Sequence, residues 1–302
     1  MSENSWLEKL KMMDKIHPDL LQGPGDDAAV LRAGSGEFGL VSTDMLIDRV
    51  HFDSLLHAPE LVGRKALAVN LSDIAAMGGR PGYFTVSLAV PWGTSEEYLE
   101  RIYLGMLPLM EEFHVALAGG DTTSTPGPLV VNVTIFGESI GGRFALRSHA
   151  GEDDAILVTG NLGGSLLTGR HLSFQPRVRE AAFLLERYPV RGMMDLSDGL
   201  AQDLRRMCSA CGLGAVIYPD SVPVDKSIKG QPDSLQKACT DGEDFELLMT
   251  IPEEGASELL SSQPLAPVTI SKIGNICKEK GLRLMRPSGP EPLSWTGYEH
   301  RF

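Results

Sequence analysis

The chain has 302 residues, of which 42% are hydrophobic and 22% are charged, and its formal net charge is −13 at pH 7. This composition is typical of a globular protein long enough for two domains. The excess of acidic residues argues against a nucleic-acid ligand, because nucleic acid binds basic surfaces. No apolar run approaches the roughly 20 residues that span a bilayer, and the polar start "MSENSWLEKLKMMDK" lacks the apolar core of a signal peptide. We therefore expect a cytoplasmic protein that binds neither nucleic acid nor membranes.

The first half of the chain alternates between predicted strands and helices. Pro59 suits the first turn of a helix over 60–77, which Gly78-Gly79 ends. A second helix starts at Ser95, and we expect it to be broken or bent near Pro108. The expected strands are 38–42, which runs into Thr43-Asp44, then 83–90, then 115–122, which ends in a glycine turn, and 129–139.

A polar, glycine-containing stretch at 147–155 predicts a boundary between two domains, 1–148 and 149–302. Beyond it we expect strands at 156–160, 245–251, 267–276 and 281–286, helices near 163–172, 178–187 and 253–262, and a strand, turn and helix over 192–212. Because both halves mix strands and helices, the fold class is α+β or α/β.

The cysteines and the familiar phosphate-binding signatures exclude several kinds of site. Cys208 and Cys211 form a single Cys-x-x-Cys, whereas a structural zinc site usually needs a second pair, so we interpret them as thiols on a helix. The sequence has no Walker A loop, no protein-kinase catalytic loop and no Gly-x-Ser-x-Gly elbow. "GLGAVI" at 212–217 begins like a dinucleotide fingerprint but lacks its third glycine.

Aspartates beside glycine or serine recur at the edges of the apolar strands. They are Asp26 and Asp27 behind a Gly-Pro-Gly turn, Asp44, Asp121, and Asp195 and Asp198, with Asp73 inside the first helix. Each one alone is more often a turn former or a helix cap. Together they favour a cluster for Mg²⁺, which prefers carboxylate oxygens. Chemistry alone therefore predicts a Mg²⁺-dependent enzyme that handles phosphate groups.

Six motifs in this order carry a more specific signal. They are "GPGDDAAV", "STDMLIDRVHF", "NLSDIAAMGGRP", "LAGGDTTST", "DLSDGLAQDL" and "DGEDFELL", followed by "TGYEHRF" at the end. Over nearly the whole chain they resemble the thiamine-monophosphate kinases, a family of the aminoimidazole ribonucleotide synthase superfamily.

The resemblance implies a fold, a reaction and an assembly. The N-terminal mixed α/β domain would bind ATP and Mg²⁺ and would form a β-barrel with the same domain of a partner in a homodimer. The C-terminal domain would be an α/β sandwich. The enzyme would transfer the γ-phosphoryl group of ATP directly, in line and with Mg²⁺ assistance, to thiamine monophosphate, giving thiamine diphosphate.

The resemblance also implies site residues, matched motif by motif. The expected Mg²⁺ ligands, several ions being involved, are Asp27, Ser42, Thr43, Asp44, Asp73, Asp121, Asp195 and Asp198, of which Asp44, Asp73 and Asp121 are the expected catalytic residues. The expected ATP contacts are Gly120, Asp121, Arg147 and Ser197. The expected contacts of thiamine monophosphate are His51, Glu243 and Tyr298.

The chain departs from the family pattern at a few positions around the expected acceptor site. Arg49 stands where the family often has glycine, Asp241 replaces the usual first glycine before "GED", and Arg301 is an extra residue. The role of Asp26 stays open between a partner of the metal ligands and a turn residue.

Three other functions were weighed against this one. A selenophosphate synthetase would need a reactive cysteine near its start, but the first cysteine is Cys208, and the hydrogenase-maturation relative ends in cysteine where this chain ends in Phe302. A non-enzymatic protein that binds divalent ions would explain the aspartates, but neither Arg147 nor the glycine turns.

Overall fold

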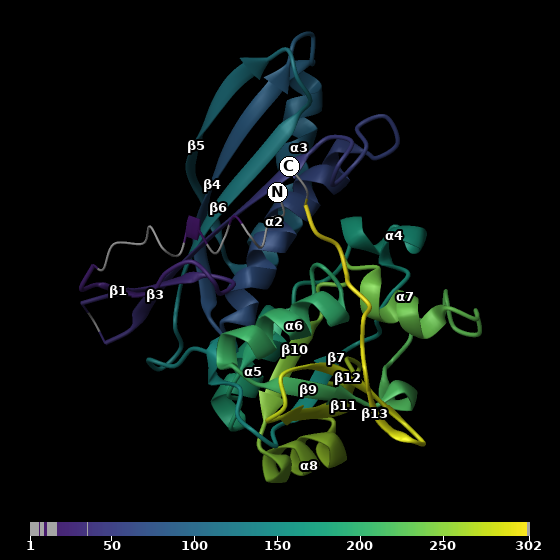
Figure 1. Cartoon of the computed structure of the whole chain (residues 1–302). Coiled ribbons are helices and arrows are strands. Elements are labelled where there is room, and N and C mark those ends of the chain that lie inside the picture. The colour runs from purple at the N-terminus through teal and green to yellow at the C-terminus, as the bar shows by residue number, and fades with distance from the viewer. Residues whose placement is uncertain (1–5, 7–8, 11–16, 35, 301–302) are drawn as a thin grey trace.

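The computed structural model describes residues 6, 9–10, 17–34 and 36–300 as a two-domain α+β fold (Figure 1). Each domain is built around one mixed sheet, and each sheet takes its strands from one half of the chain. The predicted α+β organisation is therefore confirmed. None of the described helices is long and apolar enough to cross a membrane.

The N-terminal domain contains a six-stranded sheet in the order β1-β2-β3-β6-β4-β5. Only β4 and β5 pair in parallel. Among the described residues this sheet is open, with β1 and β5 at its edges, so one chain forms no closed barrel. The strands are β1 (Leu20–Gln22), β2 (Ala29–Arg32), β3 (Phe38–Ile47), β4 (Arg80–Pro91), β5 (Ala116–Thr125) and β6 (Val130–Glu138).

Two long helices cover one face of this sheet. Helix α2 (Pro59–Ala76) packs on β3, β4 and β6, and α3 (Glu96–Phe113) packs against α2. The two helices approach closely because a Cβ at Gly63 would lie 1.8 Å from the carbonyl oxygen of Ile102, and one at Gly105 would lie 1.9 Å from that of Glu60. Glycine at these two positions therefore sets the distance between the helices.

Helix α2 is buried around most of its circumference, unlike an ordinary surface helix. Besides the first sheet and α3, it contacts α5 (Val178–Arg187) and β8 (Met193–Asp195) of the second domain. One continuous hydrophobic core includes Leu71 and Ile74 of α2 together with Leu184 and Met193 of the second domain. The helix thus joins the two domains.

The C-terminal domain contains a seven-stranded sheet in the order β13-β12-β9-β11-β7-β10-β8, in which only β12 and β9 are parallel. Its remaining strands are β7 (Ala155–Thr159), β9 (Gly214–Ile217), β10 (Leu247–Ile251), β11 (Ile270–Cys277), β12 (Gly281–Arg286) and β13 (Gly289–Pro292). Its other helices are α4 (Ser165–Thr168), α6 (Leu200–Cys211), α7 (Ser234–Thr240) and α8 (Glu253–Ser262), with short 3₁₀ turns at Arg147–His149, Arg170–Leu172 and Pro219–Ser221.

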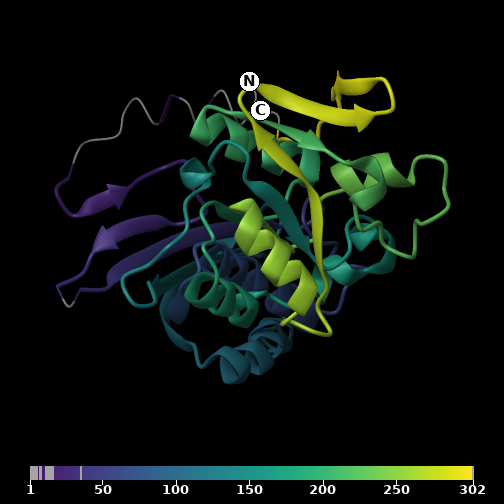
Figure 2. The same ribbon diagram turned by 90° about the horizontal axis from the view of Figure 1, so that it is seen from below.

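Alternate residues of the second sheet enter different cores. In β7, Leu157 joins the core shared with α2, and Ile156 and Val158 join a second core with α6. Helix α8 packs on β7 and β11, as the view from below shows (Figure 2), and α6 packs on β9 and β12. The sheet is therefore covered by helices on both faces.

Two local features differ from the expectations. Helix α3 is not broken at Pro108, one of the two expected outcomes, but continues through it to Phe113. Pro108 has no N–H that could donate to the carbonyl of Leu104, four residues earlier in the helix. Because Leu104 is exposed, water can hydrate this carbonyl instead. Strand β5 continues through Gly119-Gly120 to Thr125 without a glycine turn. A Cβ at Gly120 would lie 1.9 Å from the carbonyl oxygen of Val86, so glycine here lets β4 and β5 approach.

The stretch that began like a dinucleotide fingerprint is strand β9, which the sequence pattern did not predict. A Cβ at Gly214 would lie 1.9 Å from the carbonyl oxygen of Glu279. This glycine therefore serves the packing of the backbone beside β12 and no phosphate loop.

Candidate active site

Four aspartates from both domains form a cluster near the C-terminal end of α2, in which Asp27 and Asp195 are buried and Asp44 and Asp73 are half-buried. Carboxylate oxygens of Asp27, Asp73 and Asp195 lie within 4.8 Å of one another. Asp44 joins them, since its carboxyl group interacts directly with that of Asp73 and with the charge of Asp27. The loop before β2, strand β3, helix α2 and the end of β8 thus each supply one carboxylate. Four of the predicted metal ligands are therefore brought together.

Two serines orient the carboxylates of this cluster. Ser42 Oγ donates to Asp73 Oδ2 at 2.5 Å, and Ser72 Oγ donates to Asp195 Oδ2 at 2.5 Å. Ser72 and Asp73 are consecutive residues of α2, so this helix fixes carboxylates of both domains. Ser42 was itself expected as a metal ligand, and its hydroxyl contacts another expected ligand, Asp73.

Burial and mutual repulsion disfavour the charged form of these groups. Burial, together with the charge of Asp27, raises the pKa of Asp44 to about 6. Burial and neighbouring carboxylates also hold the pKa of Asp73 and of Asp195 well above the usual range. A cation would remove this penalty, because it replaces repulsion between carboxylates by attraction.

The donor set of the cluster fits Mg²⁺. All four side chains offer hard carboxylate oxygens, and no histidine or cysteine stands among them to favour a softer metal. Asp27, Asp44, Asp73 and Asp195 are the residues that would hold such an ion.

Arg147 lies against the edge of the acidic cluster. Its guanidinium forms an ion pair with Asp27, and Nε donates to Asp27 Oδ2 at 3.2 Å. Its backbone N–H donates to Asp26 Oδ2 at 3.0 Å, so Asp26 anchors the chain at Arg147. Burial, followed by repulsion from Asp27, raises the pKa of Asp26 to about 7. Before any cation binds, Arg147 is therefore the counter-charge of Asp27.

Asp198 lies in the loop between β8 and α6 and has its own partners. Its carboxylate forms an ion pair with Arg206, and its backbone N–H donates to Asp203 Oδ2 at 3.0 Å. Ser197, the residue before it, accepts from the backbone N–H of Glu243 through its carbonyl at 2.7 Å. This loop therefore connects the acidic cluster, through Asp195 at the end of β8, with Glu243.

Thr43 and Asp121 lie apart from the acidic cluster in a single chain. Side chains alternate between the faces of a strand, so Thr43 points away from the side of Ser42 and Asp44. Its hydroxyl lies 2.9 Å from that of Thr134. Asp121 is exposed on edge strand β5, three strands along from β3. That is roughly 14 Å at a spacing of about 4.8 Å per strand.

The three residues expected to contact the acceptor converge near the N-terminal end of α2. Lys65 of α2 links two of them: Nζ donates to the carbonyl of His51 at 2.9 Å and forms an ion pair with Glu243 Oε2 at 2.6 Å. The His300 ring links His51 to Tyr298, with ring centroids 5.6 Å and 4.9 Å away respectively. The structure therefore brings His51, Glu243 and Tyr298 together.

Close backbone packing assembles this part of the site from distant segments. A Cβ at Gly297 would lie 1.9 Å from the carbonyl oxygen of Asp198, to which Tyr298 N–H donates at 3.0 Å. Gly242 would place a Cβ 2.8 Å from the Ser197 carbonyl oxygen. The C-terminal segment, yellow in Figure 1, runs from the second domain up to the first and brings Tyr298 with it.

Sequence reasoning missed several residues of this site, among them the buried Lys65. A signal was present, because Lys65 directly precedes the apolar helix stretch "ALAVNL", which Ser72 and Asp73 follow. Ser72 and His300 were missed because serine in a helix and histidine near a chain end are ordinary features. Arg49 has φ of 69°, a conformation that glycine adopts freely, which is consistent with the glycine that the family resemblance implied at this position. Arg301 lies outside the described residues.

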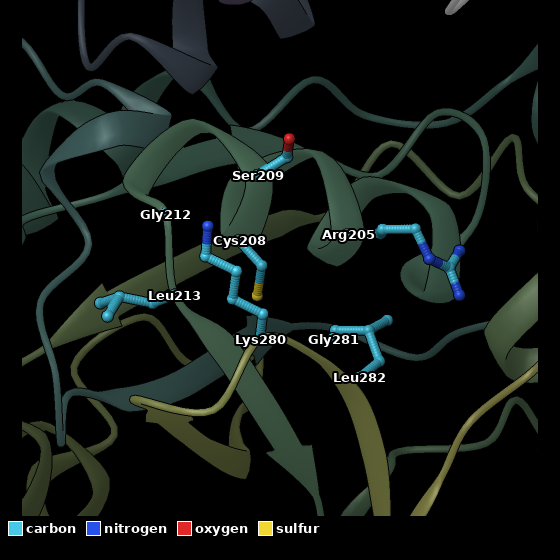
Figure 3. A pocket seen from close by; sticks show the side chains of 8 residues that line it. All are labelled: Arg205, Cys208, Ser209, Gly212, Leu213, Lys280, Gly281 and Leu282. Carbon is cyan, nitrogen blue, oxygen red and sulfur yellow. The ribbon is translucent and has the colours of Figure 1, made fainter.

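A separate surface pocket of about 230 Å³ lies between the end of α6 and the start of β12 (Figure 3). Its lining includes Arg205, Cys208 and Lys280, and none of the site residues. The Arg205 guanidinium already donates to the carbonyls of Ala201 and Trp295. Burial raises the pKa of Cys208 to about 12, so this thiol stays protonated. The residues that line this pocket therefore offer no set of metal ligands comparable with the acidic cluster.

Comparison with known proteins gives the same organisation. Residues 25–139 match the N-terminal domain of AIR synthase related proteins, and residues 141–286 match the C-terminal domain of that family. The chain is 38% identical to thiamine-monophosphate kinase of Rhodopirellula baltica, over 93% of this chain and 91% of the relative. It is 36% identical to thiamine-monophosphate kinase of Bacillus subtilis, over 94% of each chain.

Among solved structures, AaThiL complexed with AMPPCP and TMP superposes with a TM-score of 0.84 at 26% sequence identity, covering 99% of this chain and 97% of that one. The match thus extends over both domains and over every segment that contributes to the site. The chain therefore belongs to the AIR synthase related family and, within it, to the thiamine-monophosphate kinases.

Proposed function

We propose that the chain is an ATP-dependent kinase that phosphorylates thiamine monophosphate to thiamine diphosphate by direct in-line transfer with Mg²⁺. The observation that carries the proposal is that one helix, α2, links two groups of residues. Near its C-terminal end lies the carboxylate cluster, and near its N-terminal end lie His51, Glu243 and Tyr298. The names of the relatives and the ligands of AaThiL agree with a phosphoryl donor and a phosphorylated acceptor.

The acidic cluster suits the donor side of this reaction. Mg²⁺ bound there would neutralise phosphate oxygens that otherwise repel both the carboxylates and one another. Arg147 lies against Asp27 and has a buried, permanently charged guanidinium, so it can turn toward a phosphate once a cation holds Asp27. Gly120, Ser197 and Asp198 remain proposed contacts of ATP or its metal.

The residues at the other end suit the acceptor. Thiamine carries a fixed positive thiazolium and an aromatic pyrimidine. Glu243 offers a partly exposed carboxylate, and Tyr298 offers an exposed ring. Charge pairing and cation–π attraction, the latter worth about 0.5–2 kcal/mol, would hold the thiazolium. His51 has its pKa lowered to about 4, first by burial and then by Lys65, so it acts as a neutral ring.

No strong general base is required for this transfer. The acceptor is a phosphate monoester, which carries about −1.5 to −2 charge at pH 7 and is already a nucleophile. A covalent route would need an activated protein nucleophile, and an aspartate that binds a metal is a poor one. We therefore propose a single displacement without a phosphoenzyme.

We further propose that the active form is a homodimer in which the sheets of the N-terminal domains form a barrel. One face of the first sheet carries Met45, Tyr83 and Phe136 exposed, and among the described residues the outer edge of β5 has no strand beside it. Exposed apolar faces and long edge strands usually have a partner. A second copy against β5 would also give Asp121 a role that a single chain does not offer. The domain boundary at 148/149 and a cytoplasmic location remain predictions.

Replacing Asp73 with Asn should abolish turnover without unfolding the protein. The rate should fall by several orders of magnitude, because the metal contributes several kcal/mol to phosphoryl transfer. The metal-free melting temperature should stay equal or rise, because the amide removes repulsion in the cluster. Melting curves with and without Mg²⁺ and a coupled ADP assay measure both effects. Asp233→Asn, at an exposed position, is the control. Near-normal turnover of Asp73→Asn would refute the assignment.

Replacing Tyr298 with Ala should raise the KM for thiamine monophosphate roughly 2- to 30-fold, which corresponds to a lost cation–π contact. The KM for ATP should not change, because Tyr298 lies on the acceptor side. Tyr298→Phe keeps the ring and should stay near the unmodified value. An unchanged acceptor KM in Tyr298→Ala would exclude this contact.

Light scattering at micromolar concentration should give twice the mass of the chain. Met45→Lys places a charge on the exposed face of the sheet and should yield monomers. Leu167→Lys, at an exposed leucine of α4, should remain dimeric. A monomeric unmodified protein would contradict the dimer.

Transfer from ATP that is chiral at the γ-phosphorus should invert its configuration, because a single in-line displacement inverts the phosphorus. The stereochemistry of the isolated diphosphate measures this directly. Net retention, or kinetically competent label on the protein after mixing with γ-labelled ATP alone, would overturn direct transfer.

A further inference from the structure

Lys65 is a buried cation whose contacts cross from one domain to the other. Its side chain is 1% exposed and lies in the second turn of α2. Nζ contacts the His51 carbonyl in the N-terminal domain and Glu243 Oε2 in the C-terminal domain. At 1% exposure the ammonium is enclosed by these partners, through which it can act on the surrounding site.

The burial of this ammonium is costly, and stability alone does not explain it. Burial lowers the pKa of Lys65, while the charges of Glu243 and Asp44 raise it. A buried ion pair is often no more stabilising than apolar residues of the same volume. Such pairs are better known for selecting one geometry, because breaking the pair leaves a charge without compensation.

The backbone at Glu243 needs this kind of restraint. Glu243 has φ of 59° and Phe245 has φ of 50°, so two non-glycine residues of one short loop occupy the left-handed region. Hydrogen bonds hold the backbone: Glu243 N–H donates to Ser197, and Ser165 Oγ donates to the Glu243 carbonyl at 2.6 Å. The described contact that aims the carboxylate itself is the one with Lys65.

Helix α2 relates this contact to the acidic cluster. Lys65 and Asp73 are eight residues apart on the helix, which is about 12 Å along its axis. Because α2 is buried between the domains, it changes its shape little. Residues attached at Lys65 are therefore held at a set distance from the carboxylates around Asp73.

We propose that Lys65 is a positioning residue for the acceptor: it holds Glu243 of one domain and the His51 loop of the other in register with the acidic cluster, and it acts on thiamine monophosphate through Glu243. This inference rests on the proposed function. It makes recognition of the acceptor depend on the docking of the two domains.

The test compares steady-state kinetics of the purified full chain with those of Lys65→Met, Glu243→Gln and the double variant. Methionine has a similar length and no charge. Lys65→Met should raise the KM for thiamine monophosphate about tenfold or more, and it should change the KM for ATP less than about twofold. In the Glu243→Gln background, Lys65→Met should add less than about threefold, because residues that act as a unit are not additive.

Two further variants make the result decisive. Lys272→Met removes a surface pair of similar length, 2.7 Å to Glu253, far from the site, and should leave both KM values unchanged. Lys65→Gln loses the charge and keeps a donor toward the His51 carbonyl. If Lys65→Met does not fold, the same KM values are measured on Lys65→Gln.

An unchanged acceptor KM in a folded Lys65 variant would overturn the inference, as would equal increases for both substrates or fully additive effects in the double variant. In those cases the unmodified protein still phosphorylates thiamine monophosphate, so the proposed function stands. Failure of the unmodified protein to phosphorylate it would overturn both.

Discussion

The enclosure of α2 between two domains is the constraint on which the rest of the structure depends. A helix that is buried around most of its circumference must be apolar nearly everywhere, and "ALAVNL" and "IAAM" meet that demand. Against this background three polar residues of the helix have partners in other elements, whereas Asn70 donates to Ala66 of the same helix. Ser72 reaches Asp195 of the second domain, Asp73 reaches Ser42 of β3, and Lys65 reaches Glu243. The packing of one helix thus fixes both ends of the site.

The acidic cluster shows how a fold tolerates groups that oppose its stability. Carboxylates within 4.8 Å of one another repel, and burial strengthens the effect. The protein partly compensates through Arg147 beside Asp27 and through serine hydroxyls. The remaining imbalance is what makes the cluster attractive to a divalent cation, because a cation replaces repulsion by attraction. The repulsion that destabilises the cation-free protein is therefore also the source of the cluster's affinity for a divalent cation.

The acceptor end is built differently, from loops held by their backbones. The segments around Ser197, Glu243 and Tyr298 meet through carbonyl and N–H groups, and glycines at 242 and 297 permit the approach. Backbone contacts therefore bring these segments together, and the ion pair with Lys65 orients the Glu243 carboxylate among them. The departures from the family pattern also fall here: Asp241 accepts from the Gly164 N–H at 3.2 Å, and Arg49 adopts a left-handed conformation.

The sequence by itself determined the alternation of helices and strands, the boundaries of α2 and the aspartates of the cluster, because local periodicity, caps and short motifs carry that information. It did not determine that α3 continues through Pro108 or that β5 passes Gly120 without turning, since hydration of a carbonyl and the proximity of β4 decide these points. Only the tertiary structure separated Asp121 and Thr43 from Asp27, Asp44, Asp73 and Asp195, through the order of the strands and the alternation of their faces. Only the tertiary structure revealed Lys65, because the partners that make its burial tolerable come from positions 51 and 243, which no local pattern relates.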